Sequence, residues 1–494
     1  NINGSFTQNG GIYQVEVNPA GQSDLIAVTG VPGTATIGGG ATVQVVAAAG
    51  TYRRQTTYTI LSATGGVTGT YAGVTSNFAF LTPMLSYGAN DVFLTLTQAA
   101  DAFASGAQTP NQYAVGTALD IAAPTAGGDF ATVLNAMYVL DTQQGPAALN
   151  AISGQPYSGF GTANVAAGLM FMNTLGQQIA NVRGSGARGT AAATRVALAE
   201  ACVAACDAGA EPARWGAWMS GLGGMGSIGG DSNAGTFTYN FGGVAFGVDY
   251  RFDPRLVVGF AAGYTSGRQW VGGFQGSGTA DNYSAALYGS LVAGGFYADG
   301  LAGYAYSDNQ LQRSIQIPGL APRMASGRTG ANQFLGQLEV GYRIGVHAPA
   351  QVSLTPFARF QTVAAAQNGF SESGAASLNL NVARQNTTSV RTVVGADLAA
   401  SLPVGAERKL DVALRLGWAH EYADNARPMT AAFAGAPAVG FTVYGAQPMR
   451  DAAVIGLGLE TGVADQVSIY ARYDGEINGL DDAHAFSAGF RMTW

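Results

Sequence analysis

The chain has 494 residues and a formal net charge of −7, and only 11 % of its residues are charged while 47 % are hydrophobic. The high hydrophobic content excludes disorder throughout the chain. An average soluble protein has about 25 % charged residues, and the lower content of this chain is compatible with contact to lipid. The negative net charge argues against nucleic-acid binding. No uninterrupted apolar run reaches the about 18 residues of a transmembrane helix, whereas membrane β-strands remain open.

Residues 1–100 are predicted to form short β-strands. Glycines separate apolar runs such as 25–29 and 92–96, and strands of about five residues with glycine between them favour a β-solenoid or a small sandwich. The lack of a strict repeat fits the irregular end of a solenoid. The chain begins at Asn1 without a secretory segment, so we expect a processed or truncated piece.

Residues 101–213 are predicted to be helical. Pro110 suits the first position of one helix, Asp129 the cap of a second, and apolar residues at helical spacing over 165–182 predict a third. Cys202 and Cys206 are the only cysteines and share one helix face. An oxidising compartment favours a disulfide between them, and two free thiols are the alternative.

Residues 214–494 contain twelve runs in which apolar and polar residues alternate. Their lengths suit tilted membrane strands of about 10 residues joined by loops. The runs begin near Trp215, Phe241, Leu256, Tyr283, Phe296, Phe334, Val352, Thr388, Lys409, Ala452, Val467 and Ala483.

The two faces of these runs differ in polarity. In the last run, Phe486, Phe490, Met492 and Trp494 share one face, and Arg491 lies on the other. An arginine facing lipid at mid-membrane costs about 2–4 kcal/mol, so the charged face is predicted to line a lumen. A soluble sandwich with an apolar core is the alternative. The predicted lumen-lining charges are Asp249, Arg251, Glu339, Arg343, Arg359, Asp397, Asp411, Arg415, Glu460, Arg472, Asp474 and Arg491.

This pattern predicts a 12-stranded antiparallel transmembrane β-barrel. With an even number of strands, the first and the last residue of the barrel lie on the same side of the membrane. This is the periplasmic side, where short turns normally lie. If the residues ahead of Trp215 work outside the cell, a segment must thread the lumen. A barrel of about twelve strands is wide enough for one helix.

Several motifs of this region resemble those of type Va autotransporters. Residues 214–218 (RWGAW), 239–243 (YNFGG) and 247–250 (GVDY) look like the first hairpin of that family's barrel. The C-terminal residues 490–494 (FRMTW) look like the aromatic-ended signal that the barrel-assembly machinery reads. The resemblance assigns this signal to Phe486, Phe490, Met492 and Trp494.

The resemblance extends upstream over nearly the whole chain. Residues 65–71 (GGVTGTY) and 85–87 (LSY) resemble the pertactin-like end of a passenger, the family's autochaperone. Residues 111–120 and 152–155 resemble the linker, with Gln155 where the family usually has Glu. The implied organisation is a C-terminal part of a β-helical passenger over 1–100, a helical linker with a pore helix over 101–213, and a barrel over 214–494.

The resemblance implies a translocator in the bacterial outer membrane that anchors, exports and helps fold its own passenger, with the N-terminal stem at the cell surface. An adhesin is one candidate for what it displays. No enzymatic activity, cofactor or metal site is expected. The expected partners are outer-membrane lipid, the barrel-assembly machinery, periplasmic chaperones and the chain's own passenger, and the barrel is expected to be monomeric.

Two alternatives remain. One is a porin-like channel with a periplasmic N-terminal domain. The other is a translocator that cuts its own linker inside the barrel, where lumenal Asp249, Glu339 and Asp397 would act near Asn173 and Asn181 of the third helix.

Three further features are predicted to have no catalytic role. His347, His420 and His484 are interpreted as residues of loops or strand ends. Residues 221–226 match GxGxxG, but no helix is predicted to follow, so they are interpreted as a glycine-rich hairpin loop. Residues 230–232 (GDS) resemble the start of a lipase motif by chance.

Overall fold

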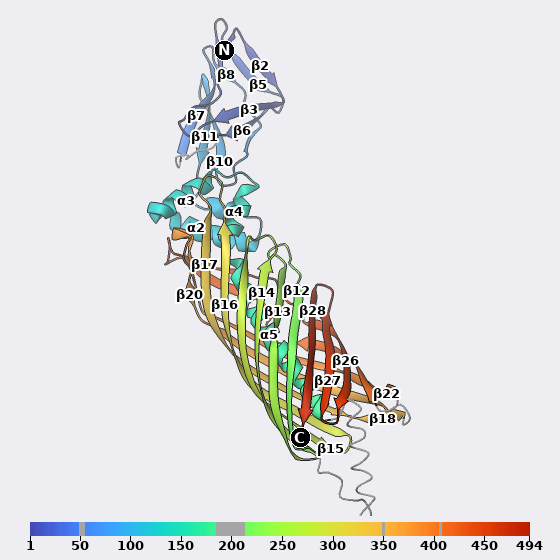
Figure 1. Cartoon of the computed structure of the whole chain (residues 1–494). Helices are drawn as coiled ribbons and strands as arrows, with labels where there is room; N and C mark the ends of the chain where they lie inside the picture. The colour runs from blue at the N-terminus through green and yellow to red at the C-terminus, as the bar shows by residue number, and fades with distance from the viewer. Residues whose placement is uncertain (49–54, 184–212, 348–350, 405–407) are drawn as a thin grey trace, which may run out of the picture.

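The computed structural model describes residues 1–48, 55–183, 213–347, 351–404 and 408–494. The molecule is elongated, with a β-rich stem at the N-terminal end, a group of helices below it and a long barrel that contains one helix (Figure 1). None of the helices within the described ranges is long and apolar enough to cross a membrane.

The stem contains three parallel ladders of short strands. Strand β1 pairs with β4 and β4 with β7, and the sets β2–β5–β8 and β3–β6–β9 pair in the same way. Ile12, for instance, lies opposite Thr42, which lies opposite Gly73. The strands are β1 (Ile2–Asn3), β2 (Phe6–Asn9), β3 (Ile12–Val17), β4 (Ile26–Thr29), β5 (Ala35–Gly38), β6 (Thr42–Ala47), β7 (Gln55–Ala63), β8 (Val67–Thr68) and β9 (Gly73–Ser76).

The stem ends in an antiparallel arrangement. Strand β11 (Asp91–Thr97) pairs with both β7 and β10 (Thr82–Tyr87). Apolar side chains from the parallel and antiparallel strands share one core, in which Val43, Ile60 and Leu94 are fully buried. The antiparallel strands therefore close the apolar interior at the end of the stem nearest the helices.

Short helices connect the stem to the barrel. They are α1 (Ala102–Ser105), α2 (Pro110–Ala122), η1 (Ala123–Thr125), α3 (Gly128–Tyr138), α4 (Gln144–Ile152) and η2 (Gln155–Ser158), and the long α5 (Gly159–Arg183) follows them. Pro110 begins α2 as predicted, and Thr109 caps it by accepting the Gln112 N–H. The predicted cap of the second helix is wrong. Gly127 precedes α3 without a side-chain cap, and Asp129 instead binds Arg323 of the barrel.

The predicted 12-stranded antiparallel barrel is confirmed. The first and last strands, β12 and β28, pair along their length and close it. Its strands are β12 (Trp215–Ile228), β13 (Phe237–Asp253), β14 (Leu256–Val271), β15 (Gly276–Ala293), β16 (Phe296–Ile315), β17 (Arg323–Tyr342), β19 (Val352–Gln367), β22 (Gln385–Val404), β23 (Arg408–Glu421), β26 (Asp451–Ala464), β27 (Val467–Ile477) and β28 (Asp481–Thr493), and the short β18 (Ile344–His347) follows β17.

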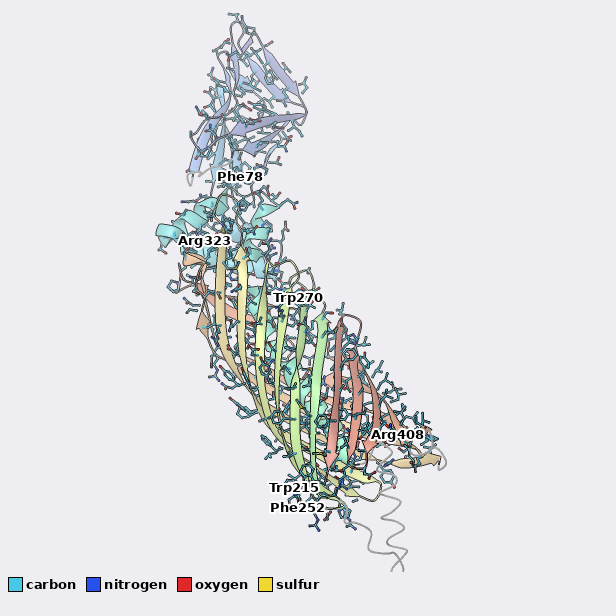
Figure 2. The ribbon with its side chains drawn as sticks, viewed as in Figure 1. Phe78, Trp215, Phe252, Trp270, Arg323 and Arg408 are labelled. Atoms are coloured by element: carbon cyan, nitrogen blue, oxygen red, sulfur yellow. The ribbon has the colours of Figure 1, made fainter. Side chains whose placement is uncertain are left out.

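The two ends of the barrel differ. Trp215, Phe252 and Arg408 mark the end away from the stem, where short turns join the strands (Figure 2). Long loops lie at the end that faces the stem, among them 368–384 and 422–450. The hydrophobic outer face predicted from the alternation is exposed in the structure, for example at Leu338, Leu416 and Phe490.

Several strands are longer than predicted. β13 begins at Phe237, β15 at Gly276 and β17 at Arg323, ahead of the expected starts at Phe241, Tyr283 and Phe334. Near the stem the polarity of the two faces is inverted: in β16 and β17, Leu311, Ile315 and Ala325 are buried inside, whereas Gln310 and Arg328 face outward. The prediction identified strands by an apolar outer face. It therefore missed the parts of the strands that extend beyond the apolar band of the membrane.

The inward apolar side chains belong to a structure that we call the cap. It comprises residues 102–158 and a four-stranded sheet from the barrel loops. The strands of that sheet are β20 (Phe370–Ser371), β21 (Leu380–Val382), β24 (Pro428–Phe433) and β25 (Gly440–Tyr444), and the short helix η3 (Ala376–Leu378) lies between the first two. Phe103, Phe130 and Leu149 of the helices pack in one core with Leu378 and Phe433 of the loops.

A buried ion pair joins the two halves of the cap. The guanidinium of Arg313 on β16 donates to both carboxylate oxygens of Glu372, each at 2.6 Å, and the Tyr157 hydroxyl donates to the same carboxylate at 2.6 Å. Arg313 also donates to the carbonyl of Ala151 in α4. Every guanidinium nitrogen and both carboxylate oxygens have a hydrogen-bond partner, which is the condition under which buried charge is tolerated.

An exposed ion pair at the edge of the cap gives a prediction for acid conditions. Arg323 and Ser377 donate to the Asp129 carboxylate and hold its pKa well below its usual range, with the bond from Arg323 as the larger cause. This stabilisation is present above the pKa of the unfolded chain, about 4, and is lost as pH falls through the lower folded-state value. Because Asp129 is 41 % exposed, Asp129→Asn is expected to cost at most about 1 kcal/mol and to reduce the loss of cap stability below pH 4, measured by acid unfolding of both proteins.

Candidate functional site: the barrel lumen and its helix

Helix α5 runs through the barrel from the cap to the opposite end (Figure 1). Its 25 residues give a length of about 37 Å at 1.5 Å per residue, which exceeds the about 30 Å of a bilayer core. At its last turn the Arg251 guanidinium donates to the Val182 carbonyl at 3.0 Å. Eighteen of the helix residues are buried although the helix is only weakly amphipathic, because the barrel surrounds it.

Glycines allow the helix to approach the barrel wall. A Cβ at Gly161 would overlap Thr387, and Cβ atoms at Gly168 and Gly176 would lie 2.9 Å from Leu335 and Gln337. The wall has matching small residues, since a Cβ at Gly224 would lie 2.9 Å from the Met170 sulfur. The prediction that residues 221–226 form a hairpin loop is therefore wrong: they lie within strand β12, where glycine makes room for the helix.

This close fit predicts the effect of enlarging α5. Gly161→Leu would force leucine atoms into Thr387, so we expect the seated helix to be destabilised by about 1–3 kcal/mol. The measurement is proteolysis of the purified protein within α5. Ala166→Leu is the matched control because Ala166 lines a cavity. Equal protease sensitivity of the two variants would contradict a close fit on the Gly161 side.

A cluster of buried polar residues lies beside the junction of the first and last strands. Arg491 of β28 and Asp249 of β13 form a bidentate ion pair across β12, with distances of 2.5 and 2.9 Å. Tyr288 donates to Asp249 at 3.0 Å and accepts the indole N–H of Trp218 at 2.9 Å. Side chains of four strands thus bond to one another inside the barrel.

A second cluster is centred on Glu339 of β17. Arg359 donates to its carboxylate at 2.6 Å and Tyr297 donates at 2.8 Å. Arg415 approaches it at 3.3 Å and also forms a bidentate pair with Asp397 at 2.6 and 2.7 Å. Two arginines and two carboxylates therefore neutralise one another on the wall of the lumen.

The wall also holds the helix through polar contacts. Arg359 and Gln361 donate to the Asn173 side-chain oxygen at 3.1 and 3.0 Å. Lower in the lumen, Gln177 donates to Asp474, Arg472 to Asn181, and Arg183 of the helix to Asp299. These contacts recur from Asn173 to the C-terminal end of α5, so they fix the rotation of the helix as well as its position.

The structure brings most of the predicted lumen-lining charges into these contacts. Asp411 accepts a hydrogen bond from Ser401 at 2.8 Å. Arg343 and Glu460 are half-buried. Cys202 and Cys206 lie outside the described residues.

The outer surface carries the residues of the predicted assembly signal. Phe486, Phe490, Met492 and Trp494 are 43–51 % exposed on one side of the C-terminal strand. His420 lies near the end of β23 and binds Asp451, and His484 lies near the start of β28, where its ring accepts from or donates to Tyr473. His347 is the last residue of β18.

Sequence reasoning missed several polar partners. Arg391 of β22 and Glu476 of β27 form a bidentate pair at 2.7 Å across β23 and β26, and Asp299 binds Arg183. All three wall residues follow the inward register of their strands, so extending the alternation through every strand would have found them. Arg313 also follows the inward register of β16. Glu372 had no such signal, because it lies in a barrel loop just after β20.

A family model described as "Autotransporter beta-domain" matches residues 217–474, just over half of the chain. The chain belongs to the autotransporter β-domain family. Two curated relatives from Serratia marcescens, each named "Extracellular serine protease", are 27 % identical over 484 and 469 residues. The matches cover 88 % of this chain and 43 % of each relative, so the chain spans less than half the length of those proteins.

Solved translocator domains are similar to the autotransporter barrel. That of NalP from Neisseria meningitidis is 14 % identical with a TM-score of 0.45, covering 62 % of this chain and 98 % of its own. The transport unit of AIDA-I from Escherichia coli is 15 % identical with a TM-score of 0.40, covering 61 % and 97 %. At these scores the assignment rests on the family model.

Membership of the autotransporter β-domain family establishes the general function of this chain. It is a type V secretion translocator of the outer membrane, and its apolar outer face and charged lumen are the surfaces that such a barrel needs.

Proposed function

We propose that this autotransporter exports its N-terminal segment through the barrel, holds residues 1–158 outside the cell and promotes their folding there. The observation that carries the proposal is the shared core of the cap. Apolar side chains of residues 102–158 are buried against loops at the long-loop end of the barrel, and α5 leads from that end back through the lumen. The long loops of outer-membrane barrels normally lie on the extracellular side of the membrane.

The stem is proposed to be the C-terminal end of a β-helical, pertactin-like passenger. Three parallel ladders in which each strand pairs with a strand one turn later are the arrangement of a β-solenoid. The antiparallel strands β10 and β11 would end the coil. Phe78, between the stem and the helices (Figure 2), pairs with Asp141. Phe80 is buried in the cap core, so the stem would fold onto a base already attached to the barrel.

Folding of this kind favours export over return. Burial of apolar surface contributes about 25 cal/mol per Å², and residues 102–158 reach their buried positions only on the loop side of the membrane. Any movement of the chain back into the lumen would have to expose that surface again. The cap would therefore act as a stop against return.

The two alternative functions are less well supported. A porin-like channel needs an open lumen, whereas α5 occupies this one. Self-cleavage needs a carboxylate beside an asparagine of the helix. The partners of the Asn173 and Asn181 oxygens are the cationic Arg359 and Arg472 together with Gln361, an arrangement that favours retention of the helix.

The proposed partners are those expected from the sequence: outer-membrane lipid around a monomeric barrel, periplasmic chaperones, and the barrel-assembly machinery bound through the C-terminal strand. The names of the Serratia marcescens relatives make a serine protease a candidate passenger class beside the predicted adhesin. Casein hydrolysis and cell adhesion by the complete gene product would separate the two.

Exposure of the stem is tested by treating intact cells with a protease that does not cross the outer membrane. We expect loss of residues 1–100 while a periplasmic marker protein is spared. An antibody against the stem follows the result, and lysed cells serve as the positive control. Protection of the stem in intact cells combined with cleavage in lysed cells would place it in the periplasm and overturn the proposal.

A further inference from the structure

A cavity of about 190 Å³ lies beside the first half of α5, at the long-loop end of the barrel. We call it the upper cavity. It is bounded by the helix between Thr162 and Asn173, by the ends of β12, β27 and β28, and by residues 425–427 and 448–450 of a long loop. Part of its wall is apolar, as at Met225, and part is formed by arginines.

Arg427 in this wall is a buried cation without an ion pair. It is 6 % exposed, and no carboxylate of the described residues lies within ion-pair distance of its guanidinium. A buried charge without a counter-ion is costly, so an anion from outside the described residues is the expected partner. The other buried arginines of the described ranges each pair with a carboxylate: Arg313 with Glu372, Arg359 with Glu339, Arg391 with Glu476 and Arg491 with Asp249.

The hydrogen bonds of Arg427 leave part of its guanidinium free. Nε donates to the Thr162 Oγ1 at 3.1 Å, and Nη1 donates to the carbonyls of Asp424 and Ala426 at 3.3 and 3.1 Å. Nη2 makes no hydrogen bond with any described residue. Because the three acceptors are neutral, they hold the guanidinium in place without balancing its charge.

The place of Arg427 beside α5 makes the lack of a counter-charge more costly. Thr162 is the fourth residue of this helix, whose N-terminal end carries the positive partial charge of the helix dipole. Burial lowers the pKa of Arg427, and the carboxylates of Glu421 and Asp424 offset only part of that effect. An anion in the upper cavity would interact favourably with both the guanidinium and the helix end.

A second arginine, Arg450, lines the cavity from the same loop. Its Nη1 donates to the carbonyls of Glu421 and Ala423 at 3.0 and 2.8 Å, and it has no ion pair with a described residue. Arg427 and Arg450 therefore bind carbonyls of one short segment, residues 421–426. Two guanidinium groups with free N–H donors suit the several oxygens of a phosphate group.

The carboxylates of the upper cavity do not take the place of this anion. Each of them accepts hydrogen bonds from donors other than Arg427 and Arg450. Five carboxylates and three arginines line the cavity, so long-range attraction does not draw an anion in, and a site must rest on direct contact with the free donors. The carboxylates are those of Glu421, Asp474, Glu476, Asp481 and Asp482.

The upper cavity opens near the level of the lipid headgroups. His420 of β23 and His484 of β28 line it. Each follows an outward-facing aromatic residue by two positions toward the long-loop end, Trp418 and Phe486 respectively, which are 48 and 49 % exposed. Aromatic side chains in such positions mark the boundary of the membrane. A phosphate group can therefore reach the cavity from solution or from the outer leaflet.

We propose that the upper cavity binds one phosphate group, with Arg427 and Arg450 as its ligands beside the first turn of α5. Free phosphate and a phosphorylated lipid headgroup share this chemistry. The bound group supplies the counter-charge of Arg427 and thereby stabilises the contact of the loop with Thr162. The site is separate from export of the polypeptide, because it is formed only with α5 in place.

The test is the temperature at which the purified full chain in detergent unfolds, followed by its mobility in electrophoresis after heating. Inorganic phosphate replaces chloride at constant ionic strength. We expect a saturable rise, because a ligand that binds only the folded state stabilises it by mass action, and calorimetry should give one phosphate per chain. Arg427→Met should abolish the rise. In phosphate-free buffer this variant should unfold no earlier than the wild type, because it removes an unpaired buried charge.

Three variants serve as comparisons. Arg328→Met removes an exposed arginine that pairs with Asp308 and should keep the full response to phosphate. Arg427→Lys keeps the charge but loses the planar fork, and we expect it to weaken binding about tenfold or more. If Arg427→Met does not assemble, Arg450→Met changes an exposed side chain and should also weaken binding.

The source of the phosphate is distinguished in phosphatidylcholine vesicles with and without phosphatidic acid. A rise that requires phosphatidic acid assigns the lipid headgroup, and a rise with inorganic phosphate assigns a ligand from solution. Arg427→Met should abolish either one. No rise with either probe, a rise that Arg427→Met retains, or equal protection by acetate at the same concentration would each overturn the proposal.

Discussion

Replacement of Glu372 by alanine is expected to open the cap. The carboxylate binds Arg313, Tyr157 and the backbone N–H of Leu380, and its side chain has no exposed surface. Its removal leaves the Arg313 guanidinium buried without an ion pair, which typically costs about 3–5 kcal/mol. Hydrogen exchange of the backbone amides of residues 102–158 would measure the loss, and we expect their protection to fall while the barrel strands stay protected.

Two controls separate buried charge from a general effect of the substitution. Asp308→Ala breaks the exposed pair with Arg328 and should cost at most about 1 kcal/mol. The double variant Glu372→Met with Arg313→Met removes both charges and is expected to recover much of the stability, as apolar replacements of buried pairs often do. A cap that is weakened equally by the single and the double variant would contradict this account.

Replacement of Asp249 by alanine is expected to weaken closure of the barrel. Asp249 is the partner of Arg491 across the strand that joins the two ends of the sheet, and it also accepts from Tyr288. Loss of the carboxylate leaves a buried arginine without its ion pair beside β12 and β28, again at a cost of about 3–5 kcal/mol. The folded barrel should then convert to the unfolded form at a lower temperature, followed by its mobility in electrophoresis with and without heating.

The matched control for this substitution is Asp451→Ala. Asp451 also lies on a barrel strand and binds His420, but its side chain is 54 % exposed. Its replacement should leave the temperature of conversion nearly unchanged. If Asp249→Ala melts like the control, strand pairing between β12 and β28 holds the junction without help from the lumenal ion pair.

The barrel was predictable because one simple rule governs most of it. Residues such as Leu338 and Phe490 face outward and residues such as Glu339 and Arg491 face inward, so alternation alone gave the strand number. The same rule missed the beginnings of β13, β15 and β17. There the outside is water, and the apolar residues point inward, against the first part of α5 for β13 and β15 and against the cap for β17.

The partners within the cap and lumen were harder to predict. Arg313 and Glu372 are 59 positions apart and Asn173 and Arg359 are 186 apart, and neither spacing follows from local structure. Balanced charge in the lumen was expected from the alternation along the strands, but the choice of each partner depends on the stagger of the strands and on the rotation of α5. Both are properties of the closed barrel with its helix in place.

The cap core has a practical consequence for attaching foreign cargo to this barrel. Because residues 102–158 and the loops bury one another's apolar side chains, a fusion made immediately before β12 would leave Leu378, Phe433 and Phe441 uncovered at the mouth of the barrel. Such a carrier would expose an apolar surface at the mouth of the barrel and would be prone to aggregation. The suitable grafting point is therefore on the stem side of Phe78, where a new cargo keeps the helices that cover the loops.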